Sequence, residues 1–135
     1  MAIQWTADLS VGVDEIDAQH RELYAMIAAL HDAMRMNQLD RVAVVIHFLE
    51  RYAVEHFATE ERMMDAKGYP GLQEHRSHHE AFVADFLRHK ELVATKGFRP
   101  SVVMALSEWL GSWLREHVRK VDGEMGHFLR SLDRA

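Results

Sequence analysis

Two pairs of potential metal-binding side chains lie within the segment from residue 56 to residue 79. His56 and Glu60 are four residues apart, His75 and His79 are also four apart, and a Gly-Tyr-Pro-Gly turn at residues 68–71 separates the pairs. Residues four apart lie on the same face of a helix, so each pair can direct two donor atoms at one point. Two such pairs facing each other across a turn form half of a metal cage.

The composition restricts the donors that such a cage can use. The chain of 135 residues contains ten His and no Cys, which excludes disulfides, thiolate zinc sites and iron–sulfur clusters and leaves nitrogen and oxygen as ligands. Sixteen basic and 21 acidic residues give a net charge of −5 without an acidic tail, so nucleic acid and anionic membranes are not expected partners. The sequence has neither an apolar run that could cross a bilayer nor a start of signal-peptide type, and we expect a cytoplasmic protein.

Hydrophobic periodicity predicts an all-α chain that folds as one domain over residues 1–135. Residues 1–16 lack helical periodicity and are expected to form an extended arm. The predicted helices cover residues 17–37, 40–66, 71–95 and 101–122, with a short terminal helix at 125–132. Asp17 and Asp40 are candidate N-caps, and Asp122 is expected to close the fourth helix. Long helices with short connections predict an up-down-up-down antiparallel four-helix bundle.

This antiparallel arrangement brings seven possible metal ligands to one end of the predicted bundle. They come from the start of the first helix, the last part of the second, the start of the third and the end of the fourth. These residues are His20, His56, Glu60, His75, His79, His117 and Asp122. Five imidazoles and two carboxylates buried without a cation would cost several kcal/mol for each unpaired group, against a net stability of about 5 to 15 kcal/mol. A bound metal is therefore the simplest explanation.

The remaining histidines have positions that predict other roles. His47, His78, His89 and His127 fall off the apolar stripes and are expected at the surface. His31 shares a helix face with His20 but lies roughly 16 Å further along the axis, so we expect a hydrogen-bonded interior residue. Glu61, the neighbour of Glu60, is expected to point away from the stripe and to be solvated.

The order and spacing of the seven candidate ligands resemble the hemerythrin family. The matching pattern runs from His20 through His56-x-x-x-Glu60 and His75-x-x-x-His79 to His117-x-x-x-x-Asp122. Further matches are Trp5, Gly12-Val13, Ile16-Asp17-x-Gln19-His20 and Trp113-Leu114-x-x-His117. The resemblance covers essentially the whole chain, which is similar to single-domain bacterial members without an attached signalling domain.

The resemblance implies a non-haem di-iron centre. One iron would be held by His75, His79 and His117, and the other by His20 and His56. Glu60 and Asp122 would bridge both irons together with an oxo or hydroxo group. One iron is then closed, and the other keeps an open position at which dioxygen binds. The residues that match the wall of this oxygen pocket are all apolar: Phe57, Trp113, Leu114 and Val118.

The expected function is reversible dioxygen binding for carriage, storage or delivery to an oxygen-consuming enzyme, by a monomer that is not itself an enzyme. Di-iron oxidases use carboxylate-rich sites with Glu-x-x-His pairs, and no such pair lies on the core stripe here. Slow peroxidase or NO-reducing activity at the open iron is one alternative. Another is an oxygen or redox sensor in which the arm around Trp5 responds to the metal centre. A metal-free phosphotransfer bundle is disfavoured, because it needs one exposed His rather than five buried ones.

Overall fold

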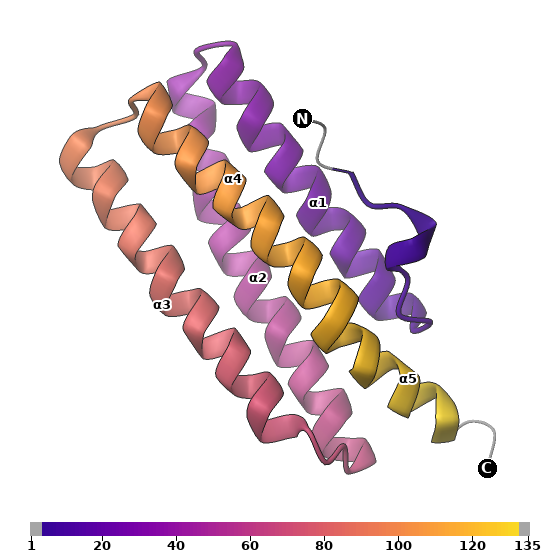
Figure 1. The fold of residues 1–135 in the computed structure, drawn as a ribbon. Coiled ribbons are helices and arrows are strands. Elements are labelled where there is room, and N and C mark those ends of the chain that lie inside the picture. Colours follow the sequence, from indigo (N-terminus) through magenta and orange to yellow (C-terminus); the bar gives the residue numbers. More distant parts are fainter. Residues whose placement is uncertain (1–3, 133–135) are drawn as a thin grey trace.

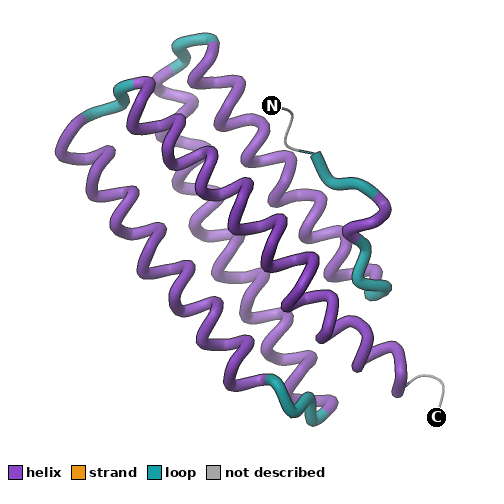
Figure 2. Tube along the Cα trace, viewed as in Figure 1, coloured by secondary structure: helices purple, strands orange, loops and turns teal. Residues whose placement is uncertain are grey.

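Four long helices run antiparallel to their neighbours in the computed structural model, which describes residues 4–132 (Figure 1). The helices are α1 (Asp14–Arg35), α2 (Leu39–Lys67), α3 (Leu72–Lys96) and α4 (Pro100–Glu116). A π-helical turn, His117–Asp122, connects α4 to α5 (Gly123–Leu132), and a short 3-10 helix, Ala7–Leu9, lies near the N-terminus. Figure 2 shows helices and loops but no strand among the described residues. The predicted all-α up-down-up-down bundle is confirmed.

Apolar side chains from all four long helices form the core between them. Their spacing of three and four residues places one face of each helix inward. The most deeply buried of them include Ile16, Ile27, Leu30, Leu49, Phe86, Leu106 and Leu110. Because burying one such side chain contributes about 1.5–3 kcal/mol, these stripes hold the helices together. None of the described helices is both long enough and apolar enough to cross a membrane.

The start of α1 differs from its prediction. The helix begins at Asp14, and its N-cap residue, Val13, makes no side-chain capping bond. Asp17 lies inside the first turn, where its carboxylate accepts hydrogen bonds from the Ser10 hydroxyl and from the Val11 backbone N–H, the latter at 2.8 Å. The prediction of Asp17 as N-cap is therefore wrong. Its carboxylate instead fastens the preceding arm to the helix.

The arm itself is shorter than the predicted residues 1–16, of which residues 1–3 lie outside the described part of the chain. Residues 4–13 lie against α1 and lead back to its first turn (Figure 1). Arg130 of α5 donates a hydrogen bond from Nη1 to the Val11 carbonyl at 3.0 Å. Gly126 packs so closely on Val11 that a Cβ would overlap its carbonyl oxygen. The arm is thus tied to both ends of the helical chain.

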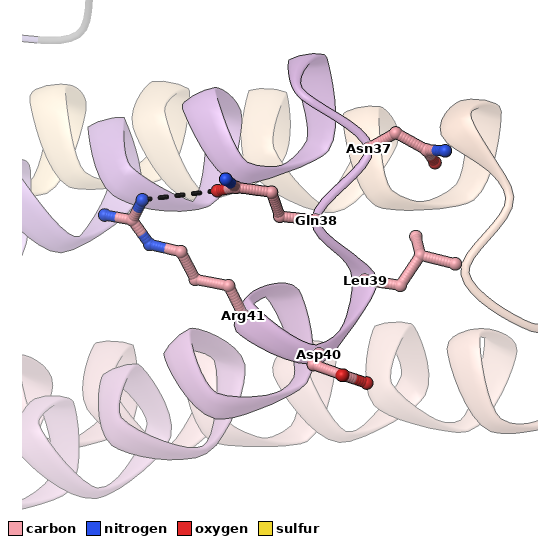
Figure 3. Close-up of a pocket in the computed structure, with 5 residues that line it drawn as sticks. All are labelled: Asn37, Gln38, Leu39, Asp40 and Arg41. Atoms are coloured by element: carbon pink, nitrogen blue, oxygen red, sulfur yellow. Dashed lines mark hydrogen bonds between the residues drawn. The ribbon is translucent and has the colours of Figure 1, made fainter.

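The turn between α1 and α2 lies at the end of the bundle remote from α5 (Figure 1). Asn37 has a left-handed φ of 56°, and the Gln38 N–H bonds back to the Ala33 carbonyl at 2.8 Å. Figure 3 shows the hollow that this turn lines, in which Arg41 donates to the Gln38 side chain at 3.3 Å. Asp40 lies within the first turn of α2, whose N-cap is Gln38. The prediction of Asp40 as N-cap is wrong, because the helix begins one residue earlier.

Glycine or proline lies at the other helix boundaries, except at the end of the predicted fourth helix. α2 ends at Gly68, whose φ of 69° favours glycine, and Pro100 begins α4, where its missing N–H costs nothing. The sequence suggested that Asp122 closes the fourth helix, and this prediction is wrong. The chain continues through the π-helical turn, and Gly123 is helical with a φ of −60°. α5 therefore extends the direction of α4 (Figure 1).

Candidate metal site

Seven buried donor side chains meet at the end of the bundle where α2 turns into α3. They come from α1, α2, α3 and the π-helical turn, and none is more than 4% exposed. They are His20, His56, Glu60, His75, His79, His117 and Asp122. The structure therefore brings together every ligand candidate that the sequence spacing suggested.

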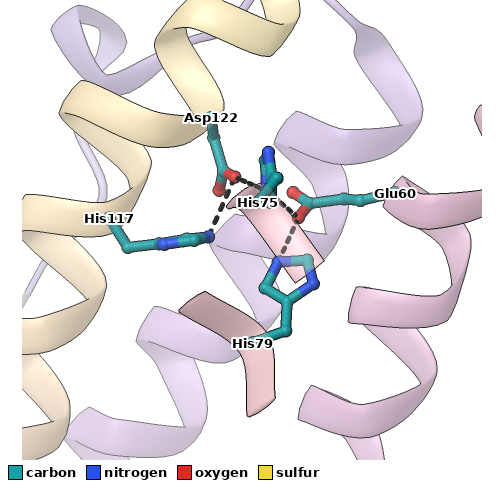
Figure 4. A group of neighbouring side chains, drawn as sticks. All are labelled: Glu60, His75, His79, His117 and Asp122. Atoms are coloured by element: carbon teal, nitrogen blue, oxygen red, sulfur yellow. Dashed lines mark ion pairs between the residues drawn. The ribbon is translucent and has the colours of Figure 1, made fainter. Parts of the chain in front are cut away.

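Five of these residues form one group, shown in Figure 4 and called here the five-residue group. His75 Nε2 lies 2.9 Å from Asp122 Oδ1 and 3.3 Å from Glu60 Oε1. His79 Nε2 lies 3.1 Å from the same Glu60 oxygen, and His117 Nε2 lies 3.1 Å from the same Asp122 oxygen. Three imidazole nitrogens and two carboxylate oxygens thus converge on one point.

The second cluster, called here the four-residue group, contains His20, His56 and the same two carboxylates. His20 Nε2 lies 3.0 Å from Asp122 Oδ2 and 3.3 Å from Glu60 Oε2. His56 Nε2 lies 3.1 Å from Glu60 Oε2. Each carboxylate therefore directs one oxygen at each group, which is the arrangement needed to bridge two metal ions.

The donor atoms fit metal ions better than they fit one another. Two ligand atoms bound to one metal at about 2.1 Å and at right angles are about 3 Å apart, which matches the separations within both groups. His79 Nε2, His117 Nε2 and both Asp122 oxygens are buried, and among the described residues their close contacts lack the geometry of a hydrogen bond. Buried polar atoms are nearly always paired, and nitrogen and carboxylate donors together suit transition metals. The site is thus able to hold two cations.

The π-helical turn explains how His117 and Asp122 reach the same site. Five residues along an α-helix rotate a side chain by about 500°, which leaves it about 140° from its starting face. In a π-helical turn the hydrogen bonds connect residues five apart, and the Gly123 N–H bonds to the Val118 carbonyl in this way. Residues five apart then share a face. The unusual turn is therefore what aligns the two donors.

Buried charges shift the titration of these groups. Burial lowers the pKa of His20, but the adjacent carboxylates of Asp122 and Glu60 outweigh burial and raise it to about 9. The same balance raises the pKa of His75 to about 9. Burial raises the pKa of Glu60, yet the neighbouring imidazoles hold it well below its usual value. Neighbouring imidazoles likewise lower the pKa of Asp122 against the effect of burial. Burial lowers the pKa of His117. The carboxylates are thus ionised and available as ligands.

Comparison with known proteins decides the family. The profile described as "Hemerythrin HHE cation binding domain" matches residues 11–129. The chain belongs to the hemerythrin family. It is 34% identical to a bacteriohemerythrin of Stenotrophomonas maltophilia, over 82% of this chain and 73% of that protein. It is 30% identical to a myohemerythrin of Riftia pachyptila, over 87% of this chain and 86% of that protein.

A solved hemerythrin structure agrees with this assignment. The crystal structure of a hemerythrin point mutant superposes with a TM-score of 0.80 at 26% identity, covering 96% of this chain and 98% of that one. The resemblance seen in the sequence is thus confirmed, and the cation-binding name of the family agrees with the two donor groups.

In this hemerythrin domain, two residues contact the Nδ1 atoms of donor histidines, on the side of each ring that faces away from the site. His56 Nδ1 lies 2.6 Å from Gln19 Oε1, and His79 Nδ1 lies 2.9 Å from Glu61 Oε2. The expectation that Glu61 is solvated is wrong, because the residue faces the groove between α2 and α3 and is 24% exposed. Its hydrogen bonds to His79 and Arg76 outweigh burial and lower its pKa. Helical periodicity could not reveal this role, since the partner lies on another helix.

The four residues predicted to wall an oxygen pocket lie beside the metal site. Phe57 stacks on His79 with ring centroids 3.9 Å apart, and Trp113 stacks on His117 at 4.3 Å. Leu114 and Val118 are buried and belong to the core. Phe57 also reaches a cleft of about 390 Å³ between α2 and α3. Two of these four residues thus cover rings of the five-residue group, and their role as the wall of an oxygen pocket stays a prediction.

The other histidines belong to neither donor group, although the His78 ring lies 6.0 Å from the His117 ring. His47, His78 and His127 are exposed, as predicted. His89 is only half-exposed, because its ring stacks on Trp109 at 4.8 Å. His31 is half-buried in a groove between α1 and α4 and is less enclosed than expected.

Proposed function

We propose that this hemerythrin binds dioxygen reversibly at two non-haem iron ions held by the seven buried residues. The observation that carries the proposal is the inequality of the two donor groups around shared carboxylates. The family match supports iron as the metal and dioxygen as the ligand. When bound, the iron pair would supply electrons to dioxygen and take them back on its release.

The residues of the chain would give the two irons different numbers of ligands. His75, His79 and His117 with the two carboxylates supply five donors to one iron. His20 and His56 with the same carboxylates supply four to the other. With one protein donor fewer, the second iron would be the one that keeps a position for an outside ligand. Dioxygen would therefore bind at the iron held by the four-residue group.

The surrounding side chains would keep this position dry and free of acids. Phe57, Leu114 and Val118 are apolar and at most 5% exposed, and the Phe57 ring lies 5.9 Å from the His56 ring of the four-residue group. None of these three apolar side chains can donate a proton to bound oxygen. An apolar wall disfavours both the entry of water and the escape of charged products. Release of oxygen unchanged is then favoured over its reduction.

Anaerobic reconstitution tests the proposal. Metal-free protein is loaded with Fe(II), the iron is counted, and absorption and Raman spectra are followed while air is admitted and removed. Two irons per chain, with bands that appear with oxygen and vanish under vacuum, are expected. Irreversible conversion to a stable oxidised form would instead support an oxidase or peroxidase, and absence of iron uptake would refute the proposal.

One observation favours a sensor as a second candidate function. The π-helical turn that contains His117 and Asp122 continues into α5, and Arg130 of α5 binds the Val11 carbonyl of the arm. A change at the metal site could thus reach the arm through one continuous helix. Limited proteolysis of metal-free, reduced and oxygenated protein tests this idea. Equal cleavage of the arm in all three states would exclude it.

A further inference from the structure

Outside the donor groups, the carboxylate of Glu61 contacts the ring of the donor His79 on the side that faces away from the site. Glu61 is next to Glu60 in α2, but the two side chains take opposite roles. Glu60 points into the site and is fully buried, whereas Glu61 points into the groove between α2 and α3. There its two oxygens bind separately, Oε2 to His79 Nδ1 at 2.9 Å and Oε1 to Arg76 Nε at 3.0 Å.

This contact fixes the protonation of the His79 ring. An ionised carboxylate can only accept hydrogen bonds, so His79 Nδ1 must carry the proton that is donated to Glu61. In the neutral ring the other nitrogen, Nε2, then holds the free electron pair. His79 Nε2 is the nitrogen that faces Glu60 Oε1 at 3.1 Å inside the site. The contact with Glu61 therefore occupies Nδ1 and leaves Nε2 as the nitrogen that can bind a cation.

The matching histidine of the four-residue group has a different partner. His56 Nδ1 lies 2.6 Å from the amide oxygen of Gln19. A glutamine side chain is neutral and, after rotation, can offer either an oxygen or an NH2 group, so it neither fixes the proton nor adds charge. His20 and His75 have buried Nδ1 atoms without hydrogen-bond partners among the described residues. Glu61 is thus a feature of the five-residue group.

We propose that Glu61 is a positioning residue that makes the five-residue group the tighter of the two metal sites and the first to fill. Its charge polarises the Nδ1–H bond of His79 and increases the electron density on Nε2, which strengthens the bond to a cation. The inference rests on the proposed metal centre, but it concerns the order and strength of binding. Loss of such a partner typically weakens metal affinity about 10- to 100-fold.

Stepwise titration of the metal-free protein with Co(II), in competition with a chromophoric chelator, tests the proposal. Glu61→Gln keeps the size of the side chain and an accepting oxygen but removes the charge. It is expected to weaken the tighter of the two dissociation constants about 10- to 100-fold, while the thermal midpoint of the metal-free protein stays close to wild type. In iron-loaded protein the same change is expected to raise the reduction potential, because a less negative surrounding favours the reduced metal.

Three variants control this experiment. Glu55→Gln removes an exposed charge from the same helix and is expected to leave both constants unchanged. Arg76→Gln removes the other partner of Glu61 but keeps the carboxylate on His79, so only a small effect is expected. Gln19→Glu places a carboxylate behind His56 and is expected to tighten the weaker site, which brings the two constants closer together.

The outcomes separate this inference from the metal centre itself. Two Co(II) ions in the wild type, with the same constants in Glu61→Gln and Glu55→Gln, would overturn the role of Glu61 and leave the metal centre intact. A fall in the thermal midpoint of metal-free Glu61→Gln without a change in either constant would also overturn it, because Glu61 would then only join helices. Absence of Co(II) uptake by the wild type would overturn both.

Discussion

The two donor groups are alike in their carboxylates and unlike in their histidines. Glu60 and Asp122 each give one oxygen to each group, at similar distances. The five-residue group adds three imidazoles, two of which are covered by stacked aromatic rings. The four-residue group adds two imidazoles, whose rings meet edge to face with centroids 4.7 Å apart.

This difference assigns separate tasks to the two kinds of donor. The shared carboxylates couple the groups, because neither can be complete without both. The histidines make the groups unequal, and an unequal pair is what a site needs if one metal is to be held firmly while the other keeps a position for an outside ligand. Changing a carboxylate should thus affect both metals, whereas changing a histidine should affect one.

Removal of a shared carboxylate is expected to have the largest effect. Glu60→Ala takes one donor from each group and leaves the imidazoles of His20, His56 and His79 without their common partner. We expect metal content to fall from two ions per chain to fewer than about one, because affinity depends on a complete set of ligands. Metal analysis after gel filtration measures this. The matched control is Glu55→Ala on the same helix, and full loading of the Glu60 variant would show that the carboxylate is not shared.

Removal of a histidine from the four-residue group is expected to affect that group alone. His56→Ala should reduce metal content from two ions to about one, because the five-residue group keeps all its donors. His47→Ala removes an exposed imidazole from the same helix and should retain both ions. Loss of both ions in the His56 variant would mean that the groups fill only together, and the comparison between them would have to be revised.

The sequence predicted the members of both groups because helical spacing and antiparallel topology are local and simple rules. His56 and Glu60, like His75 and His79, needed only the four-residue repeat. His117 and Asp122 are five apart, a spacing that does not suit an α-helix. That mismatch could have indicated the π-helical turn. Helical periodicity alone predicts a helix end at Asp122, whereas the chain continues into α5.

The features that the sequence did not reveal depend on contacts between helices. Glu61 lies about 100° around α2 from Glu60, so periodicity alone assigns it to solvent. Its partner, His79, is supplied by the neighbouring α3, and the depth of the groove between the helices decides the contact. Asp17 was misassigned for a similar reason, because its partners belong to the arm. Rules about one helix cannot predict such pairs.

The effect of the apolar wall on irreversible oxidation should be measurable separately from its effect on the free energy of unfolding. Leu114 is buried one turn before His117, and Leu114→Ala is expected to lower the free energy of unfolding by about 2–5 kcal/mol. In iron-loaded protein it should also speed irreversible oxidation, because water gains access to bound oxygen. Chemical denaturation and the decay of the oxygenated spectrum measure the two effects. Leu30 is buried in the last part of α1, away from the metal site near the start of that helix. Leu30→Ala should cost similar stability without faster oxidation, and equal oxidation rates in both variants would refute the role of the wall.

The stability of the metal-free protein should depend on pH through two histidines of raised pKa, one from each group. Because the pKa of His20 and of His75 is raised from 6.5 to about 9, folding stabilises their protonated forms. This contribution is complete below about pH 6.5 and is lost as the pH rises through about 9. Glu60 and Asp122 have lowered pKa values, so their contribution is present above about pH 4.5 and is lost in acid.

Thermal midpoints of the metal-free protein should therefore be highest between about pH 4.5 and 6.5 and should decrease toward pH 9. Bound metal replaces the protons on the imidazole Nε2 atoms, so its affinity should increase with pH over the same range. The metal-loaded protein should accordingly keep its stability at pH 9, where the metal-free protein has lost part of its own. His20→Ala should remove one of the two contributions and make the alkaline decrease shallower. If the thermal midpoint of this variant decreased as steeply toward pH 9 as that of the wild type, the four-residue group would hold no histidine of raised pKa. The two groups would then differ in charge as well as in number of donors.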